Sequence, residues 1–316
     1  MSLRGCVMSL RSGKPRPRER KSFVSTPSES FVVGLIGEGV TPSLSPPMHE
    51  QAADRLGLRY IYRPVDLTVL GAGEGVEARL KALLHGGRDL GFNAFNITHP
   101  CKQLVLDCLD AVSDDAARLG AVNTVLIRDG QFIGHNTDFS GFASALAAGL
   151  PGAVLDRVVQ LGVGGAGSAV AYALLKAGST HLTLIDTDYS RAAERARALG
   201  RLFPGQAVAA AQSGDLPGLL AGADGFVHAT PVGMHSHPGL PLDPDLLSPR
   251  HWVADVVYRP LETELVRAAQ ARGCAVLDGG QMAVGQAVDA FELITGIRPD
   301  PNLMRQDFLD LIKRGL

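Results

Sequence analysis

The sequence predicts an α/β protein of two domains. Its 316 residues are enough for about two domains at roughly 150 residues each. Its 37 glycines, about 12% of the chain against a usual ~7%, fit a fold with many tight turns. From Phe31 onward, short apolar runs alternate with segments of helical periodicity, as βα units require.

The composition narrows the class of partner. Lys and Arg number 30 and Asp and Glu 32, so the net charge of −2 gives no basic excess for nucleic acid or an anionic membrane. The four cysteines show neither zinc-ligand spacing nor a disulfide framework, which favours a reducing, cytoplasmic setting. The uncharged stretch 158–175 reaches membrane-span length, but its glycines indicate a strand, a turn and a helix. We therefore expect a small-molecule substrate and a monomer or homodimer.

Residues 1–30 are predicted to be a disordered, basic tail outside the fold. They contain seven cationic side chains, two acidic ones and little periodic apolar content. The first folded domain is predicted at 31–138. Its strands are expected at 31–36, 60–65, 91–97, 122–128 and 131–134, the last two joined by an Asp129-Gly130 turn, and its helices at 47–56, 76–84, 102–109 and 114–119.

The second domain, 139–284, is predicted to be a Rossmann-type, doubly wound dinucleotide-binding domain that follows a helix at 138–148. Strands at 157–161, 181–185, 225–228, 252–257 and 275–277 alternate with helices at 165–177, 190–199 and 262–272. Closing helices are expected at 282–295 and 303–312. We expect this C-terminal part, 285–316, to pack back on the first domain.

A glycine-rich motif follows the first strand of the second domain. Gly162, Gly164 and Gly167 match G-x-G-x-x-G between an apolar strand and a helix. The first glycine turns the chain, and the second lets the backbone approach a pyrophosphate. The N–H groups where the helix starts, at Gly165 and Ala166, can then bind that anion. A turn that serves packing alone is the simpler interpretation, but it does not account for the acidic residue after the next strand.

That acidic residue is Asp186, 19 positions after Gly167. A carboxylate there would accept hydrogen bonds from both adenosine ribose hydroxyls and would repel a 2′-phosphate, so NAD is favoured over NADP. A simple turn residue is the alternative. Arg191 could lie along the adenine or meet a 2′-phosphate, but the negative charges of Asp186 and Asp188 disfavour the phosphate.

Lys102 and Asp138 are candidate catalytic residues because each begins a helix after a strand. A cation in the first helical turn opposes the helix dipole, and a residue that breaks a local rule is a candidate for function. The simpler interpretations are a solvated lysine and an aspartate that serves as N-cap or first-turn acid. If the two strand ends are adjacent, the pair can hold a hydroxyl and move its proton.

Ser43 and Ser45 precede a predicted helix, and helix capping accounts for one of these hydroxyls but not for both. His49-Glu50 begins an H-E-x-x-H pattern whose fifth residue is Ala53, so no metal site is predicted.

These motifs resemble the shikimate dehydrogenase family over nearly the whole chain from residue 31. The family's motifs stand in order as Ser43-Leu44-Ser45-Pro46 with His49, Asn96-Ile97-Thr98-His99-Pro100-Cys101-Lys102, 121–124 with 134–138, the glycine loop, 229–234, 255–258, and 280–282 leading to Gln286.

The resemblance implies that 31–138 is a substrate-binding catalytic domain and 139–284 an NAD-binding domain. It implies that Lys102 and Asp138 are the catalytic pair, with Lys102 taking the proton of a ring hydroxyl as hydride leaves the same carbon for NAD, without a metal. The substrate-binding residues that it implies are Ser43, Ser45, Asn96, Thr98, Lys102, Asn123, Asp138, Tyr258 and Gln286. The cofactor-binding residues that it implies are Gly162, Gly164, Gly165, Ala166, Asp186, Arg191, Thr230, Val256 and Gly279.

Two departures bear on the place within the family. Asp186-Thr187-Asp188 stands where NADP-dependent members usually carry Asn-Arg-Thr, and His49-Glu50 stands where biosynthetic members usually show His-Asn. Together with 286–291, these residues resemble the NAD-dependent quinate/shikimate dehydrogenases of quinate catabolism. These oxidise quinate or shikimate to 3-dehydroquinate or 3-dehydroshikimate. His228 replaces a family Asn beside the cofactor, although an imidazole can donate a hydrogen bond similarly.

Three alternatives stay open. One is an NADP-dependent enzyme of the shikimate pathway for aromatic amino acid biosynthesis, with Arg191 as phosphate clamp. The others are a non-catalytic, cofactor-binding regulatory paralogue and a folate-type dehydrogenase, which would leave Ser43, Ser45 and Gln286 without a purpose.

Overall fold

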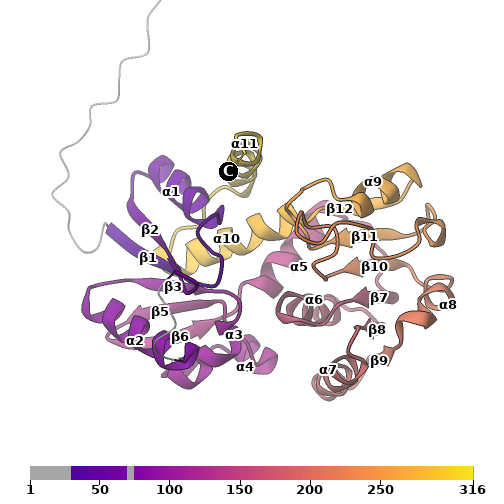
Figure 1. Ribbon diagram of the computed structural model, residues 1–316, viewed down its shortest axis with the longest axis horizontal. Helices are drawn as coiled ribbons and strands as arrows, with labels where there is room; N and C mark the ends of the chain where they lie inside the picture. The colour runs from indigo at the N-terminus through magenta and orange to yellow at the C-terminus, as the bar shows by residue number, and fades with distance from the viewer. Residues whose placement is uncertain (1–29, 70–74, 316) are drawn as a thin grey trace, which may run out of the picture.

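The computed structural model describes residues 30–69 and 75–315. Within these ranges the chain is an α/β protein with two six-stranded sheets, which confirms the predicted fold class. The sheets lie side by side, and helices α5 (Asp138–Gly149) and α10 (Gly279–Thr295) run between them (Figure 1). Of the predicted tail only Ser30 is described, and it is the first residue of a strand.

The first sheet is mixed and has the strand order β2-β1-β3-β5-β6-β4. β1, β2 and β3 are parallel, whereas β5 and β6 form the predicted hairpin, with Asp129 and Gly130 both at positive φ. Its strands are β1 (Ser30–Gly37), β2 (Arg59–Asp66), β3 (Ala94–Ile97), β4 (Ala111–Val112), β5 (Thr124–Arg128) and β6 (Gln131–His135). Its helices are α1 (Ser45–Leu56), α2 (Val76–Asp89), α3 (Cys101–Leu104), the 3₁₀ helix η1 (Val105–Cys108) and α4 (Asp114–Leu119).

The second sheet is wholly parallel in the order β12-β11-β10-β7-β8-β9, which is the doubly wound order of a Rossmann domain. Its strands are β7 (Arg157–Leu161), β8 (His181–Ile185), β9 (Ala207–Ala211), β10 (Gly225–His228), β11 (Trp252–Asp255) and β12 (Ala275–Leu277). Its helices are α6 (Gly165–Lys176), α7 (Tyr189–Leu202), α8 (Leu216–Leu220) and α9 (Glu264–Ala271), with 3₁₀ helices η2 (Ser213–Asp215) and η3 (Pro244–Leu246). The order reverses between β7 and β10, and ligands of such sheets bind beyond the carboxyl ends of the strands at that point.

Local sequence accounts for many element ends. The strand β1 is almost continuously apolar because helices and neighbouring segments bury both of its faces. Gly57 and Gly120 end α1 and α4 in the left-handed conformation, with φ of 72° and 66°, which costs glycine little. Asp188 caps α7 by accepting the Ser190 and Arg191 N–H groups.

Sequence analysis missed β4, β9 and α8 and joined two elements into one. The predicted helix 102–109 is the short helix α3 followed by η1. The segment Ala207–Ala211 contains four alanines, which favour helix, yet it pairs in register with β8 along its whole length. Tertiary pairing here overrides intrinsic propensity.

The C-terminal helices return to the first sheet. α10 and α11 (Pro301–Lys313) place Phe291, Ile294 and Phe308 in one apolar core with Val33 of β1 and Met48 of α1. Helices α10 and α11 therefore complete the core of the N-terminal sheet. Side chains of α10 also line the space between the two sheets.

Candidate active site

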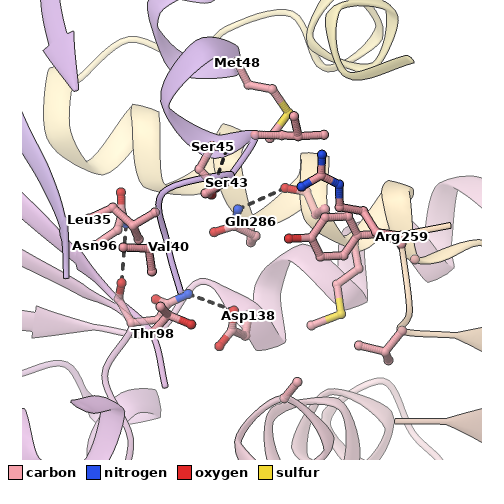
Figure 2. Close-up of a pocket in the computed structure, with 18 of the residues that line it drawn as sticks. Leu35, Val40, Ser43, Ser45, Met48, Asn96, Thr98, Asp138, Arg259 and Gln286 are labelled. Carbon is pink, nitrogen blue, oxygen red and sulfur yellow. Dashed lines mark hydrogen bonds between the residues drawn. The ribbon is translucent and has the colours of Figure 1, made fainter. Parts of the chain in front are cut away.

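A cavity of about 530 Å³ lies between the two sheets, beyond the carboxyl ends of β1 and β3 (Figure 2). Its walls come from the β1–α1 loop, the β3–α3 loop, the start of α5, the β11–α9 loop and α10. The nine residues that the family resemblance implies for substrate binding all line it: Ser43, Ser45, Asn96, Thr98, Lys102, Asn123, Asp138, Tyr258 and Gln286.

Lys102 and Asp138 form an ion pair in this cavity, with Lys102 Nζ 2.5 Å from Asp138 Oδ2. Both side chains are largely buried, at 18% and 10% exposure. Asp138 is the first residue of α5, as predicted for a first-turn acid, but the capping alternative is wrong because Asn136 supplies the cap. Asn136 Oδ1 accepts hydrogen bonds from the N–H groups of Asp138 and Phe139 at 3.0 and 3.3 Å. The Asp138 carboxylate is thereby left free for other partners.

A buried chain of hydrogen bonds leads to the Asp138 carboxylate. The Tyr62 hydroxyl donates to Asn96 Oδ1 at 2.5 Å, and Asn96 Nδ2 donates to Thr124 Oγ1 at 2.9 Å. Thr124 in turn donates to Asn123 Oδ1 at 3.1 Å, and Asn123 Nδ2 donates to Asp138 Oδ1 at 3.0 Å. The chain fixes how both amides and the carboxylate are oriented. Sequence analysis did not identify Tyr62 and Thr124 as site residues. Their contacts with Asn96 and Asn123 depend on the order and register of the strands, which the sequence does not show.

The serine loop and α10 face the same cavity. Leu44 holds the N-cap position of α1 and no side chain caps that helix, so the capping expected of one serine is wrong. Ser43 Oγ instead accepts the Ser45 N–H at 3.3 Å, and both hydroxyls lie at the cavity. Gln286 Nε2 donates to Ala283 O at 3.0 Å, a bond within α10 that leaves the amide oxygen for a ligand.

His49 lies beneath the cavity in a cluster of aromatic rings rather than in a metal site. Its Nδ1 is 3.0 Å from the Tyr60 hydroxyl, and its ring meets those of Tyr62 and Phe291 edge to face. Burial lowers the pKa of His49 to about 3. The imidazole is therefore neutral at physiological pH and supports the floor of the site.

A second cavity, of about 730 Å³, adjoins the first and shares Thr98, Lys102 and Ala166 with it. Gly164 and Gly165 line it, and a Cβ on Gly164 would meet no atom of the described chain within 4 Å, which leaves open space for a ligand.

The glycine loop and α6 have the form that a pyrophosphate requires. Gly162 has a φ of +98°, and a Cβ there would lie 2.4 Å from the Ala229 carbonyl oxygen, so the turn needs glycine. No side chain of the described residues caps α6, and its first residues, Gly165 and Ala166, line the second cavity, where free helix N–H groups can bind an anion.

Asp186 directly follows β8, beside the glycine loop, and is 6% exposed. Its carboxylate accepts the Val163 and Asp188 N–H groups, both at 3.0 Å, and pairs with the Arg191 guanidinium. Burial acts to raise the pKa of Asp186, but these hydrogen bonds outweigh it and hold the pKa below its usual range. The group is therefore an anion held in place beside the glycine loop.

His228 takes part in a buried polar cluster at the end of β10. Its Nδ1 is 2.9 Å from Asp255 Oδ1, and its Nε2 is 2.5 Å from Thr230 Oγ1. Asp255 also accepts the Thr263 hydroxyl at 2.6 Å. The imidazole, which stands where the family usually has Asn, therefore contacts Thr230, one of the cofactor residues that the resemblance implies.

The other two implied cofactor residues, Val256 and Gly279, line the first cavity. The backbones of these two residues lie close together, and a Cβ on Gly279 would be only 2.5 Å from the Val256 carbonyl oxygen.

In residues 30–69 and 75–315, no group of three or more His, Cys, Asp or Glu could hold a metal ion. Across those same ranges, no helix is both long and apolar enough to cross a membrane. The uncharged stretch 158–175 divides between β7 and α6, which both belong to the second sheet and its helices.

Comparison with known proteins places this geometry in context. Residues 35–125 match the family model described as the shikimate dehydrogenase substrate binding domain. The chain is 64% identical to a shikimate dehydrogenase (NADP(+)) of Pseudarthrobacter chlorophenolicus, over 92% of this chain and 98% of that protein. It is 48% identical to a quinate/shikimate dehydrogenase (NAD(+)) of Corynebacterium glutamicum, over 90% of this chain and all of that protein.

Among solved structures, quinate dehydrogenase from Corynebacterium glutamicum in complex with NAD superposes with a TM-score of 0.83 at 48% identity, covering 89% of this chain and 99% of that one. The fold and site thus define an oxidoreductase that uses a nicotinamide dinucleotide. The chain belongs to the shikimate dehydrogenase family.

Proposed function

We propose that this protein reversibly oxidises a ring hydroxyl of shikimate or quinate, with NAD as the hydride acceptor. The Lys102–Asp138 ion pair carries this proposal, because it lies where the two cavities meet and is surrounded by hydroxyl and amide side chains suited to a polyhydroxylated ring. The names of the relatives at 64% and 48% identity support the substrate class.

Each side chain of the cavity has a role in this proposal. In the oxidation, the neutral amine form of Lys102 Nζ holds the reacting hydroxyl and takes its proton, which makes it an ammonium; in the reverse direction this ammonium returns the proton to the carbonyl oxygen. Asp138 keeps the ammonium in position and accepts a second ring hydroxyl. NAD, when bound, takes up the hydride from the carbon that bears the reacting hydroxyl. Substrate binding is assigned to Ser43 and Ser45 for the carboxylate, and to Asn96, Thr98, Asn123, Tyr258 and Gln286 for the ring hydroxyls.

The preference for NAD is proposed from Asp186. Its carboxylate is ionised and held in place by two backbone N–H groups, so a 2′-phosphate beside it would meet a fixed negative charge. The remaining cofactor contacts are assigned to Gly162, Gly164, Gly165, Ala166, Arg191, Thr230, Val256 and Gly279.

NADP is the second candidate, and two observations favour it. The relative at 64% identity is named for NADP(+). Arg191 and Arg195 of α7 also both line the second cavity and could meet a phosphate. NAD is preferred here because Arg191 is already paired with Asp186.

The test is a matrix of four initial rates, in which quinate and shikimate are each oxidised with NAD and with NADP. Turnover with NAD, followed by the absorbance of the reduced cofactor, is expected for at least one substrate. Turnover confined to shikimate with NADP would overturn the cofactor assignment. Absence of turnover in all four reactions would support the non-catalytic alternative.

A variant isolates the role of Asp186. Asp186→Asn removes the charge and releases Arg191, so we expect the ratio of kcat/KM for NAD over NADP to fall by about ten-fold or more. Asp188→Asn is the matched control, since Asn caps a helix as well as Asp does and the charge is lost two residues away. An equal change in both variants would assign the preference to net charge rather than to Asp186.

A further inference from the structure

Arg259 reaches from the cofactor side of the gap to the serine loop. It follows β11 and is half-buried, and its Nη1 donates to the Pro42 carbonyl oxygen at 2.8 Å. Pro42 immediately precedes Ser43, and both Arg259 and Ser43 line the first cavity. Figure 2 shows Arg259 across the cavity from Leu35 and Asn96. No motif of the sequence analysis included this residue.

The charges around the first cavity leave Arg259 without a carboxylate. The described side chains that line it include two basic ones, Lys102 and Arg259, and two acids, Asp138 and Glu38. Lys102 is matched by Asp138, whereas the exposed Glu38 lies on the rim. Within the described part of the chain, Arg259 takes part in no ion pair.

A guanidinium has five N–H donors and stays protonated, and its forked shape matches a carboxylate through two parallel hydrogen bonds. Pro42 O takes one donor and fixes the side chain next to the serine loop, which leaves the others for a ligand. Ser43 and Ser45 can give a carboxylate hydrogen bonds but no charge.

We propose that Arg259 is a specificity-determining residue that recognises the carboxylate of the substrate together with Ser43 and Ser45. The inference rests on the proposed function, because both proposed substrates are carboxylates. Arg259 follows a strand of the second sheet, whereas Ser43 and Ser45 follow a strand of the first. A carboxylate bound by all three would therefore link the two domains across the cavity.

The experiment compares shikimate with its uncharged methyl ester in the wild type, Arg259→Gln and Arg259→Lys. In Arg259→Gln the KM for shikimate is expected to rise by about ten-fold or more, as for loss of a charged hydrogen bond, while the KM for the ester changes by less than about two-fold. Arg259→Lys keeps the charge but not the fork, so its KM for shikimate is expected between the two. The KM for NAD should not change.

Arg267→Gln is the matched control, because Arg267 is an exposed arginine of α9 that bonds the Glu262 carbonyl within its own segment. It should leave both KM values unchanged. Equal rises for acid and ester in Arg259→Gln would show that Arg259 only ties the domains together, and would overturn the proposal.

A measurement on the wild type gives a second test that needs no variant. If Arg259 recognises the carboxylate, the KM for shikimate should rise with salt more steeply than the KM for the ester. Equal salt dependence would overturn the inference. Failure of the proposed function is distinguishable, because the wild type would then turn over neither shikimate nor quinate.

Discussion

Asn136 is the residue that lets Asp138 act as a partner of Lys102. An aspartate at the start of a helix ordinarily accepts the first free N–H groups, but here Asn136 Oδ1 accepts them from outside the helix. Both Asp138 oxygens then have side-chain donors, Asn123 Nδ2 and Lys102 Nζ. Because Asn136 accepts the N–H groups at the start of α5, the Asp138 carboxylate is available to Lys102 and Asn123 in the cavity.

Replacing Lys102 by Ala is expected to lower kcat by about 10² to 10⁴, because the group that exchanges a proton with the substrate is lost. NAD binding, measured by fluorescence titration, should persist, since the glycine loop is unchanged. Lys176→Ala is the matched control: this lysine pairs with Asp115 at 2.8 Å but is 49% exposed on the far side of α6, so its loss should leave kcat unaltered. A Lys102→Ala enzyme with the wild-type kcat would remove Lys102 from the mechanism.

The residues that sequence analysis could find are those in motifs. Lys102 and Asp138 lie in the first turn of a helix that follows a strand, so their types and positions are visible in the chain itself. Tyr62 is different, because it meets Asn96 only through the order β2-β1-β3, in which a strand intervenes between them. Arg259 likewise depends on how the second sheet faces the first. Contacts of this kind are set by tertiary arrangement and leave no local pattern.

At the scale of elements, α5 and α10 cross so closely that glycines are required at the contact. A Cβ on Gly141 would lie 2.4 Å from the Gln286 backbone nitrogen, and one on Gly285 would lie 2.6 Å from the Gly141 carbonyl oxygen. Gly141 follows Asp138 by less than one helical turn. The crossing therefore holds the first residue of α5 and the Gln286 side chain of α10 at one cavity.

Gly141→Ala is expected to destabilise the protein by about 1–3 kcal/mol through overpacking and to raise the KM for the substrate, as Gln286 is pushed away from Asp138. Urea unfolding and initial rates measure the two effects. Gly86→Ala is the matched control, because Gly86 lies in α2 with open space around it, and alanine there should be neutral or stabilising. Stability of Gly141→Ala within about 0.5 kcal/mol of the wild type would show that the helices can separate freely.

Elements with strong patterns were predicted well, and weak ones were not. The glycine loop between β7 and α6 combines an apolar strand, a turn that needs Gly162 and a helix, so three signals agree. By contrast β9 is a short edge strand of small residues, and only its pairing with β8 makes it a strand. The five predicted strands were enough to identify a doubly wound sheet, but the edge strand β9 was missed.

At the scale of the whole molecule, the first and the last elements of the described chain share one core. Phe291 of α10 stacks on Tyr60 of β2, and Arg55 of α1 pairs with Asp307 of α11. We expected the last helices to pack back on the first domain, because a final helix after the last strand of such a sheet commonly packs on a neighbouring domain. The sequence could not predict that their contact surrounds a buried histidine, His49.

His49 makes the stability of this core depend on pH. Burial lowers its pKa to about 3, against 6.5 in an unfolded chain. Between these values the unfolded chain binds a proton that the folded protein does not, so the free energy of unfolding falls as the pH is lowered below 6.5. The expected slope approaches about 1.4 kcal/mol per pH unit, and above 6.5 the contribution is complete.

Urea unfolding of the wild type and His49→Gln between pH 7.5 and 5 measures this slope, and the variant should lose stability less steeply as the pH falls. Burial also lowers the pKa of His135 and His251, but both remain in the variant, so the difference between the slopes reports His49 alone. His181→Gln, at the exposed first residue of β8, controls for the loss of any histidine and should follow the wild type. Parallel slopes for the wild type and His49→Gln would mean that His49 accepts a proton in the folded core, and that the rings of Tyr60 and Phe291 do not exclude the charge.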